Sequence, residues 1–463
     1  MMNICVADIV SAANGKLISG NINVGIKNIS TDSRQIDIGS FFIALKGQSY
    51  DGHDYIVKSK QLGAVGCLIE KDISGEDLEQ IGSAEFAIIK VEDTMKALAL
   101  IAASYRKIFG GKVVAITGSV GKTSTKDMTA CVLERKFSVH KTQKNYNNEI
   151  GMPMTVLNLT EEHTALVVEL GMRAAGEIDY LAEIAKPDVG IISNIGVSHI
   201  EFLGSKENIF KAKMELASHI KPGGVLILNG DDEFLNTVKE YDGINVMKYG
   251  IENKAADVYA DNIITSDTGE HINFELHIKK FANEIYNVKI NVPGKHNIYN
   301  ALCAICAGIT FQMKISDIID GVASYQPPSM RQDIRISEKG YKIINDAYNA
   351  SPDSMKAAID ILDSMKCGGK KIAVLGDMVE LGEHSCKYHD EVGEYFSKTN
   401  IDILVTVGEM ARNIALKAQN KEKISFNDKS DALDYINNLI ENDDIILIKA
   451  SRAMKLDEIS EKL

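Results

Sequence analysis

Short apolar runs rich in β-branched residues recur along the chain and predict strands. FFIAL, GAVGCLI and FAIIKV fall within the first 90 residues, where turn residues separate them. Residues 94–109 have a helical pattern, and VVAIT then predicts a strand that leads into a glycine-rich loop. TALVVEL, DVGIISNI and GVLILN predict further buried strands, and KENIFKAKMELASHI predicts a helix between the last two. Strands that alternate with helices in this way are typical of a parallel α/β sheet.

The pattern changes twice beyond this sheet. Between residues 257 and 292, alternating runs such as HINFELHI predict an antiparallel appendage, and a helix is expected from about His296. The paired prolines at 327–328 predict a linker, after which YKIINDAY, KKIAVLG, DILVTVG and DIILIKA predict a second α/β region. We therefore expect an α/β protein of three domains. They are a small mixed α/β domain (1–91), a central P-loop-type mononucleotide-binding parallel sheet (92–328) and a C-terminal Rossmann-like α/β domain (329–463).

Composition supports several domains and excludes some partners. The chain has 463 residues, too many for one hydrophobic core, with 45% hydrophobic and 25% charged residues. A formal net charge of -13 argues against a nucleic-acid partner. Seven scattered cysteines indicate a reducing compartment, and Cys303 and Cys306 fall in an apolar run typical of a helix core. With no signal peptide or membrane span in the sequence, we expect a cytoplasmic monomer.

The glycine-rich loop follows a predicted strand and precedes a predicted helix in VVAITGSVGKTSTKDM. Gly118 and Gly121 let backbone N–H groups turn towards phosphates, Lys122 can reach the β- and γ-phosphates, and the Thr123 hydroxyl can bind Mg²⁺. Ile116 stands where the general P-loop has a further glycine. A chance glycine-rich turn is the alternative, but the strand and helix favour an ATP loop. Its residues are Thr117, Gly118, Ser119, Val120, Gly121, Lys122, Thr123 and Ser124.

The shortened loop TGSVGKTS resembles the ATP loop of the Mur ligases, which form amide bonds in peptidoglycan synthesis. The resemblance covers nearly the whole chain in one order, through STDSRQIDIGSFFIALKGQSYDGHDYI, TQKNYNNEIGMP, VVELGMRAAGEI, NIGVSHIEFLGSKENIFKAKMEL and VPGKHNIYNALCA. NDAYNASPDSMKAAIDIL, VLGDMVELGEHSCKYHDEVG and IKASRAMKLDEI are similar to the dipeptide-adding member. The resemblance implies that ATP drives D-alanyl-D-alanine onto UDP-N-acetylmuramoyl-tripeptide through an acyl phosphate, giving ADP and phosphate.

Catalytic residues follow from the resemblance and from their positions. Glu169 ends a predicted strand, where a side chain faces the ligand crevice of an α/β sheet. The resemblance makes Lys122, Glu169, His199 and Lys213 catalytic, with Thr123, Glu169, His199 and Lys213 as ligands of two Mg²⁺ ions. It also implies that Lys213 is carbamylated. From the residues alone, Glu169 has an ordinary surface carboxylate as its alternative, and Lys213 has a solvated lysine.

Further residues are assigned to ATP and to the substrates by the same resemblance. Asn297 and Asn300 lie on one helix face and are expected to contact adenine, although helix capping is the alternative for Asn297. Asp346 is expected to reach the ribose and Arg331 the phosphates. The expected substrate contacts are Ser33, Arg34 and Lys46 at the UDP-sugar end, Asn147 and Asn148 at the muramoyl end, and Asp377, Lys449 and Arg452 around D-alanyl-D-alanine. Solvated surface charge is the alternative for this last group.

Other functions are also compatible with an ATP loop. A different Mur ligase or a folylpolyglutamate synthase would also form amides with ATP. The STDSR, ALKG and DGHDY motifs argue against the folate enzyme, and the C-terminal motifs favour the dipeptide-adding ligase. A P-loop ATPase switch would instead turn over ATP without an amine acceptor. A non-catalytic regulator is not expected to retain both Lys122 and Glu169.

Overall fold

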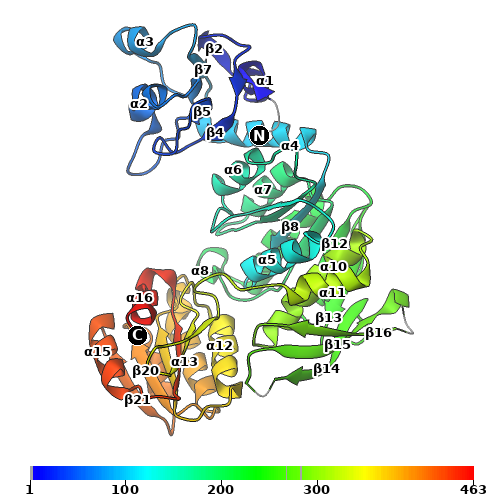
Figure 1. Ribbon diagram of the computed structural model, residues 1–463, viewed down its shortest axis with the longest axis vertical. Coiled ribbons are helices and arrows are strands. Elements are labelled where there is room, and N and C mark those ends of the chain that lie inside the picture. Colours follow the sequence, from blue (N-terminus) through cyan, green and yellow to red (C-terminus); the bar gives the residue numbers. More distant parts are fainter. Residues whose placement is uncertain (1–3, 267, 282–283) are drawn as a thin grey trace.

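The computed structural model of the chain describes residues 4–266, 268–281 and 284–463. These residues form three regions, each built around a β-sheet, that follow one another along an elongated molecule (Figure 1). The N-terminal sheet has the strand order β2-β7-β6-β5-β4, and all neighbours run parallel except β2 and β7. Its strands are β2 (Lys16–Ser19), β4 (Asn28–Ser30), β5 (Ser40–Ile43), β6 (Gly66–Ile69) and β7 (Ala87–Lys90). Around it lie β1 (Ile4–Cys5), β3 (Gly25–Ile26), α1 (Val6–Ala12), η1 (Gly52–Tyr55), α2 (Ile56–Gln61) and α3 (Gly75–Ile81).

The central sheet has nine strands in the order β16-β15-β14-β13-β12-β11-β8-β10-β9. Strands β8 to β14 pair in parallel, and β14, β15 and β16 pair antiparallel. The expected antiparallel appendage is therefore present, and it continues the edge of the parallel sheet. The strands are β8 (Lys112–Thr117), β9 (Val139–Lys141), β10 (Ala165–Glu169), β11 (Val189–Ile192), β12 (Val225–Asn229), β13 (Asn245–Gly250), β14 (Val258–Thr265), β15 (Ile272–Ile278) and β16 (Ile285–Ile290).

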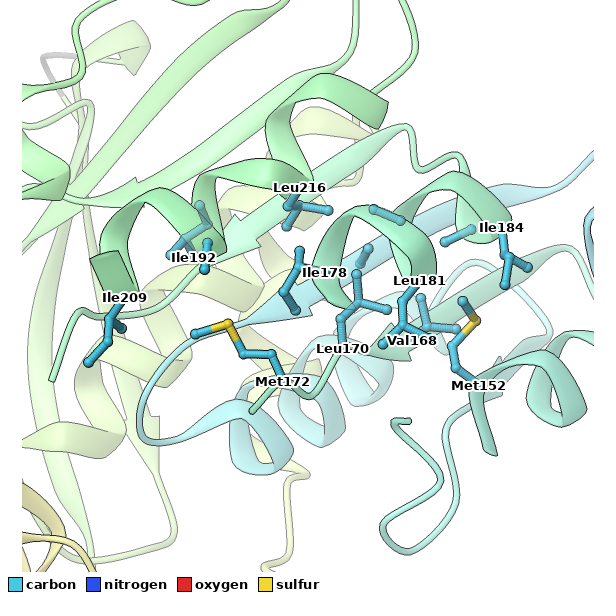
Figure 2. Close-up of a cluster of buried hydrophobic side chains, with 14 of the residues drawn as sticks. Met152, Val168, Leu170, Met172, Ile178, Leu181, Ile184, Ile192, Ile209 and Leu216 are labelled. Atoms are coloured by element: carbon cyan, nitrogen blue, oxygen red, sulfur yellow. The ribbon is translucent and has the colours of Figure 1, made fainter. Parts of the chain in front are cut away.

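Helices cover both faces of the central sheet, so its strands are apolar on both sides. In β8, Val113 and Ala115 pack into one core, while Val114 and Ile116 pack into the other. Figure 2 shows the first core, where side chains of the sheet meet those of the helices that cover it. This face carries α4 (Thr94–Ile108), α6 (Gly151–Leu157), α7 (Glu177–Ala185), α9 (Lys206–Met214) and η2 (Glu215–His219). The other carries α5 (Lys122–Leu133), α10 (His296–Thr310) and α11 (Ile315–Ala323).

The C-terminal sheet has the order β17-β18-β22-β19-β20-β21, with only the edge pair β17–β18 antiparallel among the described strands. Its strands are β17 (Asp333–Ile336), β18 (Lys342–Asn345), β19 (Lys371–Gly376), β20 (Ile403–Val407), β21 (Glu422–Phe426) and β22 (Ile445–Lys449). Its helices are α12 (Pro352–Ser364), η5 (Gly382–His384), α13 (Ser385–Phe396), α14 (Arg412–Lys417), α15 (Lys429–Leu439), η6 (Arg452–Met454) and α16 (Asp457–Lys462).

Each sheet lies within one of the three expected ranges. We therefore propose the domain boundaries 1–91, 92–328 and 329–463, with residues 326–328 outside regular structure as the second linker. Within the described ranges, no helix combines the length and apolarity needed to cross a membrane. Strand β8 lies between β10 and β11 in the central sheet, so its carboxyl end opens at a topological switch point. Such a point is where open α/β sheets bind ligands.

Candidate active site

A cavity of about 480 Å³ lies at this switch point, between the central and C-terminal domains. The phosphate loop (residues 119–124), Glu169 and the segment after β11 form its central-domain wall. Arg331, Asp346 and Lys449 form part of the opposite wall. A site walled by two domains is complete only when those domains come together.

Two glycines shape the phosphate loop. A Cβ atom at Gly118 would lie 1.9 Å from Oγ of Ser193, so a larger residue would displace this hydroxyl just beyond the end of β11. Gly121 has a φ of 82° and precedes the first residue of α5. That left-handed conformation favours glycine, and a Cβ there would also lie 2.9 Å from Oδ1 of Asn300. The loop thus brings the N-terminus of α5 to the cavity, where helix N–H groups attract anions.

Asn194 holds the phosphate loop in place, a role the sequence analysis missed. Its carbonyl accepts from the Ser119 N–H at 3.1 Å, and its Oδ1 accepts from the Val120 N–H at 2.9 Å. Its Nδ2 donates to the Val120 carbonyl at 2.8 Å. At the end of β8, directly before the loop, the buried Thr117 hydroxyl donates to the Leu170 carbonyl at 3.0 Å. The position of Asn194 after a buried strand was the only available signal.

Lys122 and Thr123 begin helix α5 inside the site. The Lys122 ammonium donates to the Gly118 carbonyl at 2.8 Å. Burial lowers the pKa of Lys122 most, and nearby Arg331 lowers it further, whereas Glu169 raises it. The Thr123 hydroxyl donates to Oε2 of Glu169 at 2.8 Å. A lysine and a hydroxyl–carboxylate pair therefore lie side by side at the start of one helix.

Glu169 ends β10 and is almost fully buried, with 3% of its surface exposed. Its Oε1 accepts from Nδ2 of Asn147 at 2.7 Å, opposite the Thr123 contact. Asn147 thus lies against the carboxylate, while Oδ1 of Asn148 accepts from the Gly151 N–H at 2.9 Å, at the first residue of α6. A buried carboxylate and hydroxyl form a hard-oxygen site of the kind that Mg²⁺ prefers.

His199 meets a carboxylate of the C-terminal domain. Its Nδ1 lies 2.8 Å from Oε2 of Glu380, at ion-pair distance but without hydrogen-bond alignment. Nε of Arg173 lies 3.9 Å from the other carboxylate oxygen. His199 and Glu380 have φ values of 65° and 63°, which non-glycine residues rarely adopt. The contact with His199 is the main cause that lowers the pKa of Glu380. The contact joins the two domains beside the site.

Lys213 is buried in the last turn of α9, with 1% of its surface exposed. Among the residues that the structure describes, none forms a hydrogen bond or an ion pair with the Lys213 amine. Burial lowers the pKa of Lys213 well below its usual value, and the positive charge of Lys122 lowers it further. The solvated lysine considered from the sequence is therefore wrong: Lys213 is a buried amine, and burial disfavours its charged form.

The predicted adenine-side residues form one buried chain of hydrogen bonds on α10. Nδ2 of Asn300 donates to Oδ1 of Asn297 at 2.9 Å, and the Thr125 hydroxyl donates to Oδ1 of Asn300 at 3.0 Å. Nδ2 of Asn297 donates to the Pro293 carbonyl at 2.6 Å and to Oε1 of Gln332 at 2.8 Å. Asn300 lines the cavity, whereas the amide nitrogen of Asn297 is engaged with the Pro293 carbonyl and with Gln332 of the C-terminal domain.

His296 and Tyr299 line the same end of the cavity and were missed from the sequence. His296 contacts the amide of Gln332, and its burial lowers the pKa of the ring to about 4. The Tyr299 hydroxyl donates to Oδ2 of Asp231 at 2.9 Å. They precede and follow Asn297, a predicted site residue, on the first turn of α10. This proximity in the sequence was the signal from which they could have been found.

Three predicted residues of the C-terminal domain line the cavity from across the linker. The guanidinium of Arg331 stacks over Tyr348, 4.0 Å from the ring centroid. Lys449 is buried and pairs with Oδ2 of Asp346, and it also donates to the Asn349 carbonyl at 3.1 Å. Lys449 therefore lies with the predicted ribose residue in this cavity, and its assignment to D-alanyl-D-alanine stays a prediction.

The remaining predicted substrate residues lie outside the lining of this cavity. The Asp377 carboxylate accepts from the Ala411 N–H at 2.7 Å, and Arg452 pairs with Asp457 at 2.8 Å. In the N-terminal domain, Arg34 pairs with Asp32 at 2.8 Å and is 82% exposed. Ser33 is buried in the same turn, and Lys46 is exposed beyond β5.

A phosphate loop, a buried carboxylate and a cavity closed by a second domain define a nucleotide-dependent enzyme of the α/β class. Comparison with known families supports a narrower statement. The profiles described as "Mur ligase family, catalytic domain", "Mur ligase middle domain" and "Mur ligase, glutamate ligase domain" match residues 25–106, 116–308 and 330–452. The chain belongs to the Mur ligase family.

Full-length relatives and solved structures agree with this assignment. The UDP-N-acetylmuramoyl-tripeptide–D-alanyl-D-alanine ligase of Bacillus subtilis is 38% identical, covering 95% of this chain and 93% of the relative. The ligase of the same name from Escherichia coli is 31% identical, covering 99% and 98%. A crystal structure of MurF from Acinetobacter baumannii superposes with a TM-score of 0.90 at 31% identity, covering 100% and 99%. MurF ligase from Thermotoga maritima in complex with ADP gives 0.82 at 29% identity, covering 94% and 96%.

Proposed function

We propose that the chain uses ATP to join D-alanyl-D-alanine to UDP-N-acetylmuramoyl-tripeptide in peptidoglycan synthesis. The observation that carries this proposal is similarity over nearly the full length to ligases of that name, 38% identical in Bacillus subtilis. The cavity between the central and C-terminal domains suits such a reaction, because it joins a phosphate loop to a second, ligand-binding sheet. The dipeptide and the UDP-linked tripeptide are then the small-molecule partners of the chain.

The chemistry requires activation of a carboxylate, because a carboxylate is a poor electrophile. A carboxylate oxygen of the tripeptide attacks the γ-phosphorus of ATP, and the bond to ADP breaks. The amine of the dipeptide then attacks the acyl carbon, phosphate leaves, and the nitrogen loses its proton. Lys122 and the N–H groups of the phosphate loop are placed to hold the charge that develops on the transferred phosphoryl group.

ATP binding is assigned along the length of the cavity. Residues 117–124 hold the phosphates, and Thr117 anchors the start of the loop through its hydrogen bond to the Leu170 carbonyl. Asn300 lies at the adenine end, and Asn297 orients it through their hydrogen bond of 2.9 Å. Asp346 is assigned to the ribose and Arg331 to the phosphates, both from the C-terminal domain. Nucleotide binding would therefore favour closure of this domain.

We assign one Mg²⁺ to the oxygens of Thr123 and Glu169, which fit its preference for hard ligands. Bound there, the ion would neutralise charge on the phosphates. A second ion at His199 and Lys213 remains a proposal from the family resemblance. In the described ranges, no three His, Cys, Asp or Glu residues are grouped closely enough to hold a metal. A carbamate on Lys213 would add the missing anion.

Carbamylation of Lys213 is supported by its environment. A neutral amine attacks the carbon of CO₂ and releases one proton, and burial lowers the pKa of this amine, which favours the neutral form. We expect Lys213→Ala to be nearly inactive and to regain activity with a short carboxylic acid. Lys211→Ala, on the same helix, is the matched control and should retain activity. Failure of every short acid to rescue Lys213→Ala would refute the assignment.

The remaining substrate contacts and the cellular setting are also proposals. Ser33, Arg34 and Lys46 would bind the UDP-sugar, and Asn147 and Asn148 the muramoyl end. The contact of Asn147 with Glu169, the proposed Mg²⁺ ligand, supports a muramoyl end close to the phosphate loop. We propose a cytoplasmic monomer. Support for the compartment comes from the seven cysteines, all free in the part of the chain that the structure describes.

The test of the proposed function is phosphate release from ATP with each substrate omitted in turn. Release should require both UDP-N-acetylmuramoyl-tripeptide and D-alanyl-D-alanine, and mass spectrometry should find the joined product. Rapid ATP turnover with one or both substrates omitted would indicate an ATPase switch and would contradict the ligase assignment.

A further inference from the structure

A second cavity of about 300 Å³ lies beside the first, where the central domain meets the helices of the C-terminal domain. It is separate from every residue that the sequence analysis assigned to D-alanyl-D-alanine. Polar and charged side chains from both domains make up most of its walls. They are Val197 and Lys206 of the central domain, with Pro352, Asp353 and Lys356 of α12 and Lys387, Tyr388 and Glu391 of α13.

The second cavity communicates with the nucleotide cavity near the phosphate loop. Lys206 and Asp353 line both of them. A Cβ atom at Gly196 would lie 2.6 Å from Oδ2 of Asp353 and 3.2 Å from Cβ of Ser119. The Asp353 carboxylate therefore lies close to the loop, at the point where the two cavities join. A molecule in the second cavity can present one end to the phosphates while its other end stays outside the nucleotide site.

The charges in this cavity suit a zwitterion. Three lysines and two carboxylates line it, in a chain whose net charge is -13. Among the residues described, no carboxylate lies within ion-pair distance of Lys206 or Lys387. Nζ of Lys356 lies 3.6 Å from Oε2 of Glu391, a loose contact that a ligand carboxylate can replace. Lys387 extends over Tyr388, 5.5 Å from the ring centroid.

The residues first assigned to the dipeptide already have partners. The Asp377 carboxylate accepts from a backbone N–H, Lys449 pairs with Asp346, and Arg452 pairs with Asp457. Using them to bind a ligand would break these contacts, whereas Lys387 and Lys206 are free to accept one. The structure therefore favours the second cavity over the loops after β19 and β22.

We propose that the second cavity binds the acceptor dipeptide, an inference that rests on the proposed function. Lys356 and Lys387 hold its carboxylate, because ammonium–carboxylate hydrogen bonds are among the stronger contacts available. Asp353 accepts from the amine and directs it towards the phosphate loop, where the acyl phosphate forms. Asp353, Lys356 and Lys387 thereby select a short peptide with a free amine at one end and a free carboxylate at the other.

Steady-state kinetics of Lys356→Ala and Lys387→Ala test the proposal with D-alanyl-D-alanine and with D-alanyl-D-alaninamide, which lacks the carboxylate. Each variant should raise KM for the dipeptide by roughly tenfold or more, as expected for loss of a charged hydrogen bond. KM for ATP and for UDP-N-acetylmuramoyl-tripeptide should stay unchanged. The wild type should strongly prefer the dipeptide over its amide, and the double variant should lose most of that preference.

Lys398→Ala is the matched control, since it removes an exposed lysine just beyond α13 and outside the cavity. Normal dipeptide KM values in both cavity variants would overturn the proposal, as would a rise in KM for ATP alone. Each of these results overturns the proposal only if the wild-type enzyme ligates the dipeptide. A wild type that does not use the dipeptide would instead refute the proposed function, so the two failures are distinguishable.

Discussion

The buried pair of Lys449 and Asp346 gives a sharp prediction, because the sequence and the structure assign Lys449 differently. The lysine side chain is 2% exposed and the aspartate 14% exposed. Lys449→Met would leave a largely buried carboxylate with the Gln332 N–H at 3.2 Å as its remaining partner. Breaking a buried pair from one side typically costs about 3 to 5 kcal/mol in free energy of unfolding. Asp346→Asn should cost a similar amount, because it leaves a buried ammonium.

The double variant Lys449→Met/Asp346→Asn removes both charges and should recover most of this loss. Urea denaturation followed by circular dichroism measures the four proteins, since the chain contains no tryptophan to report by fluorescence. In kinetics, Lys449→Met should raise KM for ATP and leave KM for D-alanyl-D-alanine unchanged. If the double variant loses as much free energy of unfolding as the two single variants together, the pairing is refuted. A rise in dipeptide KM alone would restore the interpretation made from the sequence.

Three further predictions follow from the site. Lys122→Ala should lower kcat at least about a hundredfold, since it removes the charge that we assign to the phosphates; a variant that keeps its activity in the phosphate-release assay would refute this assignment. The pKa of His296 is lowered from 6.5 to about 4, so its contribution to stability is complete above pH 6.5 and is lost as the pH falls towards 4. His296→Gln should flatten this part of a melting-temperature profile, and an unchanged profile would count against it. Glu380→Gln should weaken domain closure by about 1 kcal/mol, given a partly exposed pair; small-angle scattering should show a larger radius of gyration, and an unchanged radius would argue against the contact with His199.

Local sequence was sufficient for the elements that carry the phosphate loop. The run VVAIT is apolar at every position except its last and predicts a strand buried on both faces, as β8 is. Gly121 supplies the left-handed turn before α5. The strands β13, β17 and β21 were not predicted, because NVMKYG, DIRI and EKISF mix polar and apolar residues. β17 and β21 lie at sheet edges, where burial imposes little pattern.

Contacts between distant segments could not be read from the sequence. The pairing of Lys449 with Asp346 depends on β18 and β22 being neighbours in the sheet. A lysine at the end of an apolar strand gives no indication of whether it binds a ligand or a neighbouring carboxylate. The same holds for Glu380, which reaches His199 only when the domains are closed together. Strand order and domain closure, rather than local pattern, decide these partners.

The most direct test of the central claim follows an oxygen atom through the reaction. UDP-N-acetylmuramoyl-tripeptide labelled with oxygen-18 in the reacting carboxylate is incubated with ATP, D-alanyl-D-alanine and the enzyme. If ATP activates that carboxylate as an acyl phosphate, each ligation transfers one labelled oxygen to the released phosphate. Mass spectrometry should therefore find labelled phosphate in step with the joined product. Unlabelled phosphate would contradict the account, because ATP would then be cleaved by water rather than by the substrate.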